Sequence, residues 1–249
     1  MSNNNDSPII WYIPGFLSAD DPQKDVHRLL RTTYPNAEDI TNVIWENQNI
    51  TLVSFILNTT SYLEPWGVAL NTVDRWIRAL ADVESTSESL ANKISWLSSK
   101  QRQKLILIGH SLGGNIVIRT LANLFRKKLS IRSAVLLGAA IDNRNENIKL
   151  ALKATQKPIC SMVNPNDAAL KVFRTVTGSL ALGTGCDLKY DHTRFREYRT
   201  FSSIEHSSVF YLSQWANINN IQTNTDETPI RLLENVANFL GLKNVKGNN

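Results

Sequence analysis

Residues 104–127 constrain the fold of this chain more than any other stretch. They begin with an apolar run, Leu105 to Ile108, which predicts a strand that is covered on both faces. A Gly-x-Ser-x-Gly sequence follows, and after it the apolar residues recur with helical spacing at Val117, Leu121, Leu124 and Phe125. Strand and helix are therefore joined by a turn so tight that it forces Ser111 into a strained backbone conformation.

Glycine is required on both sides of this turn. A side chain at Gly109 or Gly113 would collide with the backbone where strand and helix cross. The helix that begins after Ser111 points its amide groups toward the serine. This arrangement is typical of a nucleophile elbow and predicts an α/β-hydrolase fold with Ser111 as the nucleophile. The alternative interpretation is a chance match in an ordinary strand-to-helix loop.

Strands and helices alternate along the rest of the chain. Apolar runs predict strands at 8–13, 133–141 and 158–163, a more polar strand at 195–201, and one further strand at 42–45 or 50–57. Helical spacing of apolar residues predicts a helix after Asp21, and either two helices or one helix broken at 85–87 over residues 66–97. Further helices are predicted at 148–152, at 168–176, from Val209 and at 228–241. The alternation predicts a mostly parallel central sheet with helices on both faces.

The length of 249 residues suits one large α/β domain. We expect that domain at 9–243, with a disordered polar tail at 1–8 and a second tail at 244–249. Cys160 and Cys186 are the only cysteines, and neither has a metal-ligand spacing around it, so we expect no metal and no cofactor. Cys160 is interpreted as a small core residue, and a disulfide between the two stays open.

Charge and hydropathy limit the partners. The net charge of +5 arises from 27 basic and 22 acidic residues that are scattered along the chain, and the one dense run, 126–128, ends the elbow helix, where cations are favourable. We therefore expect no nucleic-acid partner, and only peripheral contact with anionic lipid is left open. The sequence contains no apolar stretch of about 18 residues, so we expect no transmembrane segment. The polar start lacks a signal peptide, which predicts a cytoplasmic protein or export without an amino-terminal signal.

A serine hydroxyl needs a base that takes its proton and a carboxylate that orients the base. In this fold the chain order is serine, then acid, then histidine. His27 precedes the serine on a predicted helix and is interpreted as a surface residue, and the side chain of His110, inside the turn, should point away from that of Ser111. This leaves His192 and His206. We favour His206, because it follows the last predicted strand and precedes a helix; His192 is the alternative, and a structural His206 is a third interpretation.

Asp167 is the preferred acid, because the run Asn164-Pro165-Asn166 stops a buried strand and leaves this carboxylate at its carboxyl end. Asp142 also follows a strand and is the alternative. The negative oxygen of a tetrahedral intermediate needs backbone amide donors. We expect one from Leu112, after the nucleophile, and one from Phe16 in the loop after the first strand, where Gly15 lets the backbone approach.

Three segments resemble a known family: LIGHSLGG at 107–114, SAVLLGAA at 133–140 and SMVNPND at 161–167. They are similar to the uncharacterised α/β-hydrolase-like family that includes the eukaryotic transmembrane and coiled-coil domain proteins, over residues 9–211. The resemblance implies a serine hydrolase fold with Ser111, Asp167 and His206 at the triad positions, and no defined substrate. The membrane segments of the eukaryotic members are missing here, and the context of His206 matches loosely.

These residues together predict a serine esterase or lipase-like enzyme that cleaves a lipid-like or otherwise apolar acyl ester through an acyl-enzyme. One alternative is a binding module that keeps the hydrolase fold without catalysis. Another is an acyltransferase or thioesterase that uses the same triad. The sequence does not indicate the acyl length, the head-group or the oligomeric state.

Overall fold

The computed structural model describes residues 7–15, 23–43, 65–185, 193–200 and 206–224, and of these the side chains of Gln23, 65–78 and 219–224 are outside the description. Within those ranges the chain forms one sheet of six strands in the order β2-β1-β3-β4-β5-β6. Every neighbouring pair is parallel. The strands are β1 (Ile9–Ile13), β2 (Asp39–Asn42), β3 (Leu105–His110), β4 (Ser133–Leu137), β5 (Ile159–Val163) and β6 (Phe195–Arg199).

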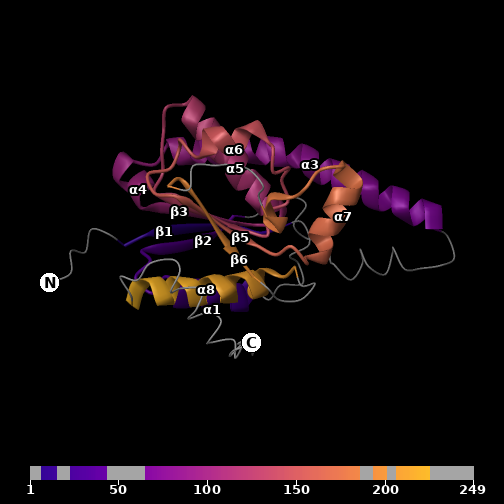
Figure 1. Cartoon of the computed structure of the whole chain (residues 1–249). Helices are drawn as coiled ribbons and strands as arrows, with labels where there is room; N and C mark the ends of the chain where they lie inside the picture. The colour runs from indigo at the N-terminus through magenta and orange to yellow at the C-terminus, as the bar shows by residue number, and fades with distance from the viewer. Residues whose placement is uncertain (1–6, 16–22, 44–64, 186–192, 201–205, 225–249) are drawn as a thin grey trace, which may run out of the picture.

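Helices cover both faces of the sheet (Figure 1). One face carries α3 (Pro65–Ser95), α4 (Ser99–Lys104), α5 (Leu112–Arg126) and α6 (Glu146–Ala151). The other face carries α1 (Gln23–Thr33) and α8 (Ser208–Asn224), which pack against each other. Helix α7 (Ala168–Thr177) and the 3-10 turn η3 (Leu182–Thr184) follow the carboxyl end of β5. The predicted α/β architecture with a parallel sheet is confirmed.

The two faces have separate apolar cores, because successive side chains of a strand point to opposite sides of the sheet. On β3, Leu105 and Leu107 belong to the core under α3, α5 and α6. Ile106 and Ile108 belong to the core under α1 and α8. This two-sided burial explains why the strand is a continuous apolar run rather than an alternating one.

Some element boundaries differ from the predictions. The edge strand β2 ends at Asn42, where the prediction began a strand, and residues 50–57, 192 and 228–241 lie outside the described residues. Helix α3 is continuous through the serine-rich segment. Ser85 and Ser87 donate hydrogen bonds from their hydroxyls to the carbonyls of Asp82 and Glu84 in the preceding turn, which is compatible with a helix. The prediction of a possible break there was wrong.

The strand order places a switch point between β1 and β3. From β1 the chain moves outward to β2, and from β3 it moves in the other direction through β4, β5 and β6. Loops after two such strands leave in opposite directions and open a site at the carboxyl ends. Gly15 follows β1 there, and Ser111 follows β3. None of the helices that the structure describes has the length and apolarity to cross a membrane.

Candidate active site

The turn between β3 and α5 holds Ser111 in a left-handed backbone conformation, with φ 53° and ψ −121°. L-residues rarely adopt this region, and the neighbouring strand holds the turn in place. The Ser111 amide donates to the carbonyl of Leu137 at 3.0 Å, and the Ser111 carbonyl accepts from the amides of Ala140 and Gly114. The end of β4 therefore fixes the strained residue on both sides.

The glycines of the motif are needed where the structure crowds its backbone. A Cβ atom at Gly113 would overlap the carbonyl oxygen of Ile13, and one at Gly109 would lie 2.5 Å from the carbonyl oxygen of Gly113. Gly15, in the loop after β1, would bring a Cβ within 2.7 Å of the Ser111 Cβ. Backbone after β1 therefore approaches the serine closely, as the switch point requires.

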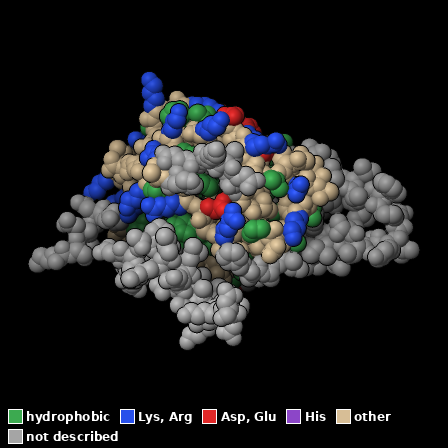
Figure 2. Space-filling model, in the orientation of Figure 1, with side chains coloured by type: hydrophobic (Ala, Val, Ile, Leu, Met, Phe, Trp, Pro, Cys, Tyr) green, Lys and Arg blue, Asp and Glu red, His purple; other side chains and the backbone are tan. Residues whose placement is uncertain are grey.

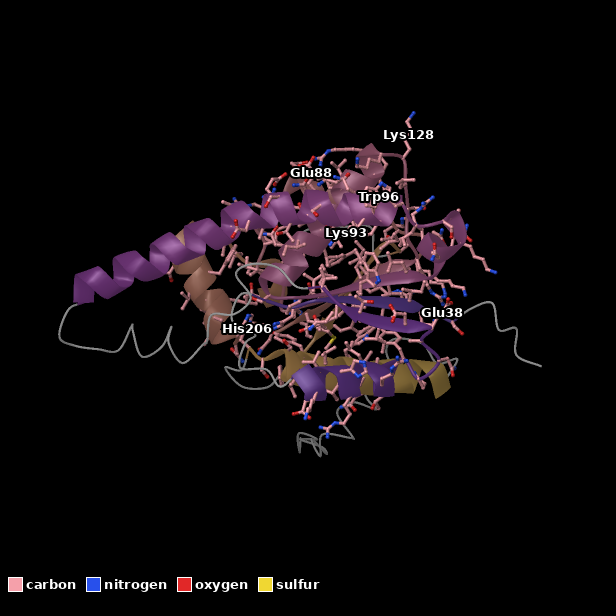
Figure 3. All side chains as sticks on the ribbon, turned by 180° about the vertical axis from the view of Figure 1, so that it is seen from behind. Glu38, Glu88, Lys93, Trp96, Lys128 and His206 are labelled. Atoms are coloured by element: carbon pink, nitrogen blue, oxygen red, sulfur yellow. The ribbon has the colours of Figure 1, made fainter. Side chains whose placement is uncertain are left out.

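Two further side chains from distant segments join Ser111 in one line of hydrogen bonds. His206, just before α8, places Nε2 2.8 Å from the Ser111 Oγ and Nδ1 2.5 Å from Oδ2 of Asp167. The carboxylate of Asp167 can only accept hydrogen bonds, so Nδ1 of His206 carries the proton. Nε2 is then left with a lone pair that accepts the hydroxyl proton of Ser111. Figure 3 shows His206 at the end of the sheet that carries the carboxyl termini of the strands.

Asp167 reaches this position through a turn after β5. Its backbone amide donates to the carbonyl of Asn164 at 3.1 Å, and its side chain caps α7 by accepting at Oδ1 from the amide of Leu170 at 3.0 Å. The residue is completely buried. A buried carboxylate requires donors, and a helix amino terminus stabilises its negative charge.

Tyr211 is a member of this cluster that the sequence did not indicate. Its hydroxyl donates to Oδ2 of Asp167 at 2.7 Å, and its side chain is fully buried. Burial and the charge of Asp167 raise the pKa of Tyr211, so the hydroxyl stays protonated. In the sequence Tyr211 stands in an apolar helical pattern and looks like an ordinary core residue. No motif or spacing in the sequence marks it as a partner of Asp167.

Gly138 makes room for the Tyr211 ring. It follows β4 with φ +52°, and a Cβ there would lie 2.7 Å from two carbon atoms of the ring. A tyrosine ring can therefore cross the end of β4 and reach the carboxylate. The position requires glycine for its backbone conformation as well as for space.

His110 lies beside the cluster without contacting the serine hydroxyl. Its Nδ1 is 3.1 Å from the Ser208 hydroxyl at the start of α8, and its ring centroid is 4.9 Å from that of His206. Burial, and secondly the neighbouring His206, lower the pKa of His110 well below its usual value. His110 is thus a neutral support between β3 and the segment that carries His206.

The remaining residues that the sequence suggested for the site lie outside this line of hydrogen bonds or outside the description. Asp142 is partly exposed and accepts at 2.9 Å from the Arg144 amide. Burial alone would raise the pKa of Asp142, but hydrogen bonds from Arg144 and Ser179 outweigh it and hold the pKa below its usual range. The Asp142 carboxylate is thus engaged with Arg144 and Ser179, whereas Asp167 is the carboxylate that reaches His206. Leu112 is buried at the first position of α5. Phe16 and His192 lie outside the described residues.

The described part of the chain holds no group of three or more His, Cys, Asp or Glu side chains that could ligate a metal ion. The arrangement that it does hold is a hydroxyl, an imidazole and a carboxylate in one line of hydrogen bonds. Such a line can move the hydroxyl proton to the imidazole while the carboxylate stabilises the cation that forms.

Comparison with known proteins matches the chain to one family. A family model described as "Alpha/beta hydrolase of unknown function (DUF900)" matches residues 71–222, which is more than half of the chain. No curated protein shows significant similarity.

Similar solved structures share little sequence. A dienelactone hydrolase from Anabaena variabilis is 13% identical, with 85% of this chain and 83% of that chain covered and a TM-score of 0.41. A putative cell surface hydrolase from Lactobacillus plantarum is 10% identical, with 94% and 98% covered and a TM-score of 0.45. A hyperthermophilic esterase from Pyrobaculum calidifontis is 12% identical, with 87% and 77% covered and a TM-score of 0.45.

Proposed function

The chain belongs to the family of alpha/beta hydrolases of unknown function (DUF900), and from that premise we propose that it is a serine hydrolase that cleaves a carboxylic ester. The observation that carries the proposal is the continuous line from Ser111 Oγ to His206 at 2.8 Å and from His206 to Asp167 at 2.5 Å. Both distances are within the reach that proton transfer requires.

In the proposed reaction the Ser111 oxygen forms a bond to the ester carbonyl carbon while His206 takes the hydroxyl proton at Nε2. Asp167 stabilises the imidazolium through Nδ1. The tetrahedral intermediate collapses, the bond to the leaving oxygen breaks, and His206 gives its proton to the departing alcohol. Water then attacks the acyl carbon while His206 takes one of its protons. The bond between the acyl group and the Ser111 oxygen breaks, His206 returns the proton to that oxygen, and the acid leaves.

The carbonyl oxygen becomes negative in the intermediate and needs donors. We assign one to the amide of Leu112, because the first amides of a helix have no carbonyl partner within the helix. We assign the second to the amide of Phe16, because Gly15 brings the preceding backbone against Ser111.

For the substrate we propose an ester with an apolar, lipid-like acyl group. The residues whose backbone holds Ser111 are Leu137, Ala140 and Gly114, which place no charge beside the nucleophile. Among these described residues a charged acyl group would find no ion-pair partner. The likeness to the family of the eukaryotic transmembrane and coiled-coil domain proteins stays a prediction, and it adds no substrate.

The test is labelling with a fluorophosphonate, which bonds only to an activated serine. We expect the purified full chain to be labelled, and Ser111→Ala to lose the label and about 10⁶-fold in kcat toward p-nitrophenyl esters of increasing acyl length. Ser213→Ala is the matched control, because the Ser213 hydroxyl only donates to the carbonyl of Phe210 on α8.

The result also separates the alternative functions. Folded protein that takes no label would support the binding module and contradict catalysis. Labelled protein that transfers the acyl group to an added alcohol, or that prefers a thioester, would support the acyltransferase or thioesterase.

A further inference from the structure

Acidic residues are missing from the middle of this chain. Residues 89–141 contain nine lysines and arginines and no aspartate or glutamate. The segment includes the end of α3 and all of α4, β3, α5 and β4. Because α4 leads into β3 and α5 leads away from it, the ends of α3 and α5 and the whole of α4 lie at the amino-terminal edge of the sheet, opposite the candidate active site.

Backbone contacts join the loops of this edge into one surface. The guanidinium of Arg102 donates to the carbonyl of Leu97, at the end of α3. The Arg132 amide, before β4, donates to the carbonyl of Arg102 at 3.1 Å. The amide of Lys157, before β5, donates to the carbonyl of Arg132 at 2.8 Å. Residues that are far apart in the sequence therefore present their side chains from one continuous edge.

The lysines of this edge are not neutralised by described residues. At this edge, five exposed lysines form no ion pair with a described residue, namely Lys93, Lys100, Lys127, Lys128 and Lys157. Of the acids nearby, Glu38 pairs with Lys104 and Glu84 pairs with Arg119, whereas the exposed Glu88 on α3 pairs with no described residue. In Figure 2, Lys and Arg side chains lie at the left end of the molecule, where Figure 1 places α4, and along the top, and others lie at the right.

One large aromatic side chain stands among these cations. Trp96 is 84% exposed, whereas the next most exposed large apolar side chain of the described chain, Val176, is 42% exposed. The backbone of Trp96 is held in place, because its amide donates to the carbonyl of Lys93 and the following Leu97 packs against the core. Figure 3 shows Lys93, Trp96 and Lys128 on the same side of the ribbon. We call these two residue types together the basic edge: Lys93, Trp96, Lys100, Lys127, Lys128 and Lys157.

We propose that the basic edge docks on a bilayer that contains anionic lipid. Lysines near such a surface are attracted to its negative potential, and each strengthens binding about fivefold. Tryptophan prefers the headgroup region, where its ring is in apolar surroundings and its N–H is hydrated. A nucleic acid is the less favoured occupant, because lysine provides a point charge without the bidentate fork of arginine, and because a single aromatic ring makes no stacking platform.

Docking by this edge determines how the enzyme faces the membrane. Strand β3 has six residues between the basic edge and Ser111, a span of about 20 Å at the usual rise of a strand. In Figure 3, Trp96 and Lys128 lie toward one end of the molecule and His206 toward the other. The candidate active site therefore faces away from the bound bilayer.

The test is co-sedimentation of the full chain with vesicles of phosphatidylcholine alone or mixed with phosphatidylserine. We expect binding only to the mixed vesicles, weakened by added salt. Lys100→Glu/Lys157→Glu should bind at least about 25-fold more weakly, because each lost lysine is worth about fivefold. The matched control, Lys171→Glu/Arg174→Glu, makes the same charge change on exposed positions of α7, at the opposite edge, and should bind like the unaltered protein.

Trp96→Ala should bind several-fold more weakly with the charge unchanged. Equal loss in the two double variants, no binding to the mixed vesicles, no effect of Trp96→Ala, or tighter binding to DNA or RNA than to vesicles at the same salt would each overturn the proposal. Ser111→Ala protein should dock normally, so failure of the docking proposal and failure of the hydrolase proposal give different results.

Discussion

Tyr211 and His206 both hydrogen bond to the same oxygen, Oδ2 of Asp167, at 2.7 Å and 2.5 Å. The other oxygen accepts from the amide of Leu170. Three donors thus surround a fully buried carboxylate. Hydrogen bonds to a charged group are stronger than neutral ones, and they hold the group in one orientation. We infer that Tyr211 positions Asp167 for His206.

Tyr211→Phe should lower kcat by about 10- to 100-fold with KM nearly unchanged, because a hydrogen bond to a charged group contributes about 1.5–3 kcal/mol. The measurement is steady-state kinetics on an ester that the unaltered protein cleaves. Tyr34→Phe is the control, since the Tyr34 hydroxyl accepts from the indole of Trp215 away from the site. Equal kcat in the Tyr211 variant and the unaltered protein would contradict the positioning role.

Asp167→Asn should abolish most activity while the fold survives. Asparagine caps a helix about as well as aspartate does, so the contact to the Leu170 amide is retained. With its oxygen held by the Leu170 amide, the asparagine turns its NH₂ group toward Tyr211 and His206. That group only donates and accepts from neither residue, so the imidazole loses the partner that holds the proton on Nδ1. We expect a loss of about 10⁴-fold in kcat. A melting temperature within a few degrees of the unaltered protein, measured by circular dichroism, would show that the loss of activity is not caused by unfolding. A near-normal kcat would exclude Asp167 as the acid.

Gly138→Ala should damage both stability and activity. The position has φ +52°, and the added Cβ would lie 2.7 Å from the Tyr211 ring. Gly178→Ala is a matched control, because Gly178 also has a positive φ, +71°, but has nothing within 4 Å of an added Cβ. The control should lose only about 1 kcal/mol of unfolding free energy, from conformation. The Gly138 variant should lose more unfolding free energy than the control, and its kcat should fall because the Tyr211 ring is displaced. Equal effects of the two substitutions would refute the steric role of Gly138.

His110 should make the fold sensitive to acid. Burial lowers the pKa of His110 in the folded protein well below the usual value, whereas the unfolded chain keeps a pKa near 6.5. Below about pH 6.5 the unfolded chain therefore binds a proton that the folded chain does not, and this term reduces stability as pH falls, by up to about 1.4 kcal/mol per pH unit.

The variant that checks this is His110→Phe, which keeps a ring and cannot titrate. Urea unfolding between pH 7 and pH 5 should show a shallower loss of unfolding free energy in the variant than in the unaltered protein. The comparison concerns the slope with pH, because losing the contact to Ser208 lowers stability at every pH. Parallel slopes would show that His110 is not the titrating group.

The Ser111 turn was predictable because its requirements are local. A buried strand, glycines at fixed spacing and an amphipathic helix lie within 24 consecutive residues. Crowding of adjacent backbone explains the glycines at 109 and 113. The alternation of strands and helices likewise predicted the parallel sheet. Element ends were less predictable: β4 stops at Leu137, because Gly138 turns the chain out of the sheet.

What the sequence by itself determined is therefore the fold class, the strained serine, and an acid and a histidine in the expected order. Only the tertiary structure decided which carboxylate faces His206, since Asp142 and Asp167 both follow strands and only packing turns one of them toward the histidine. It also decided that Tyr211 reaches Asp167 across 44 residues of chain and that lysines before three strands form one edge. Such contacts depend on the register of neighbouring strands and the packing of helices, which no local pattern of residues encodes.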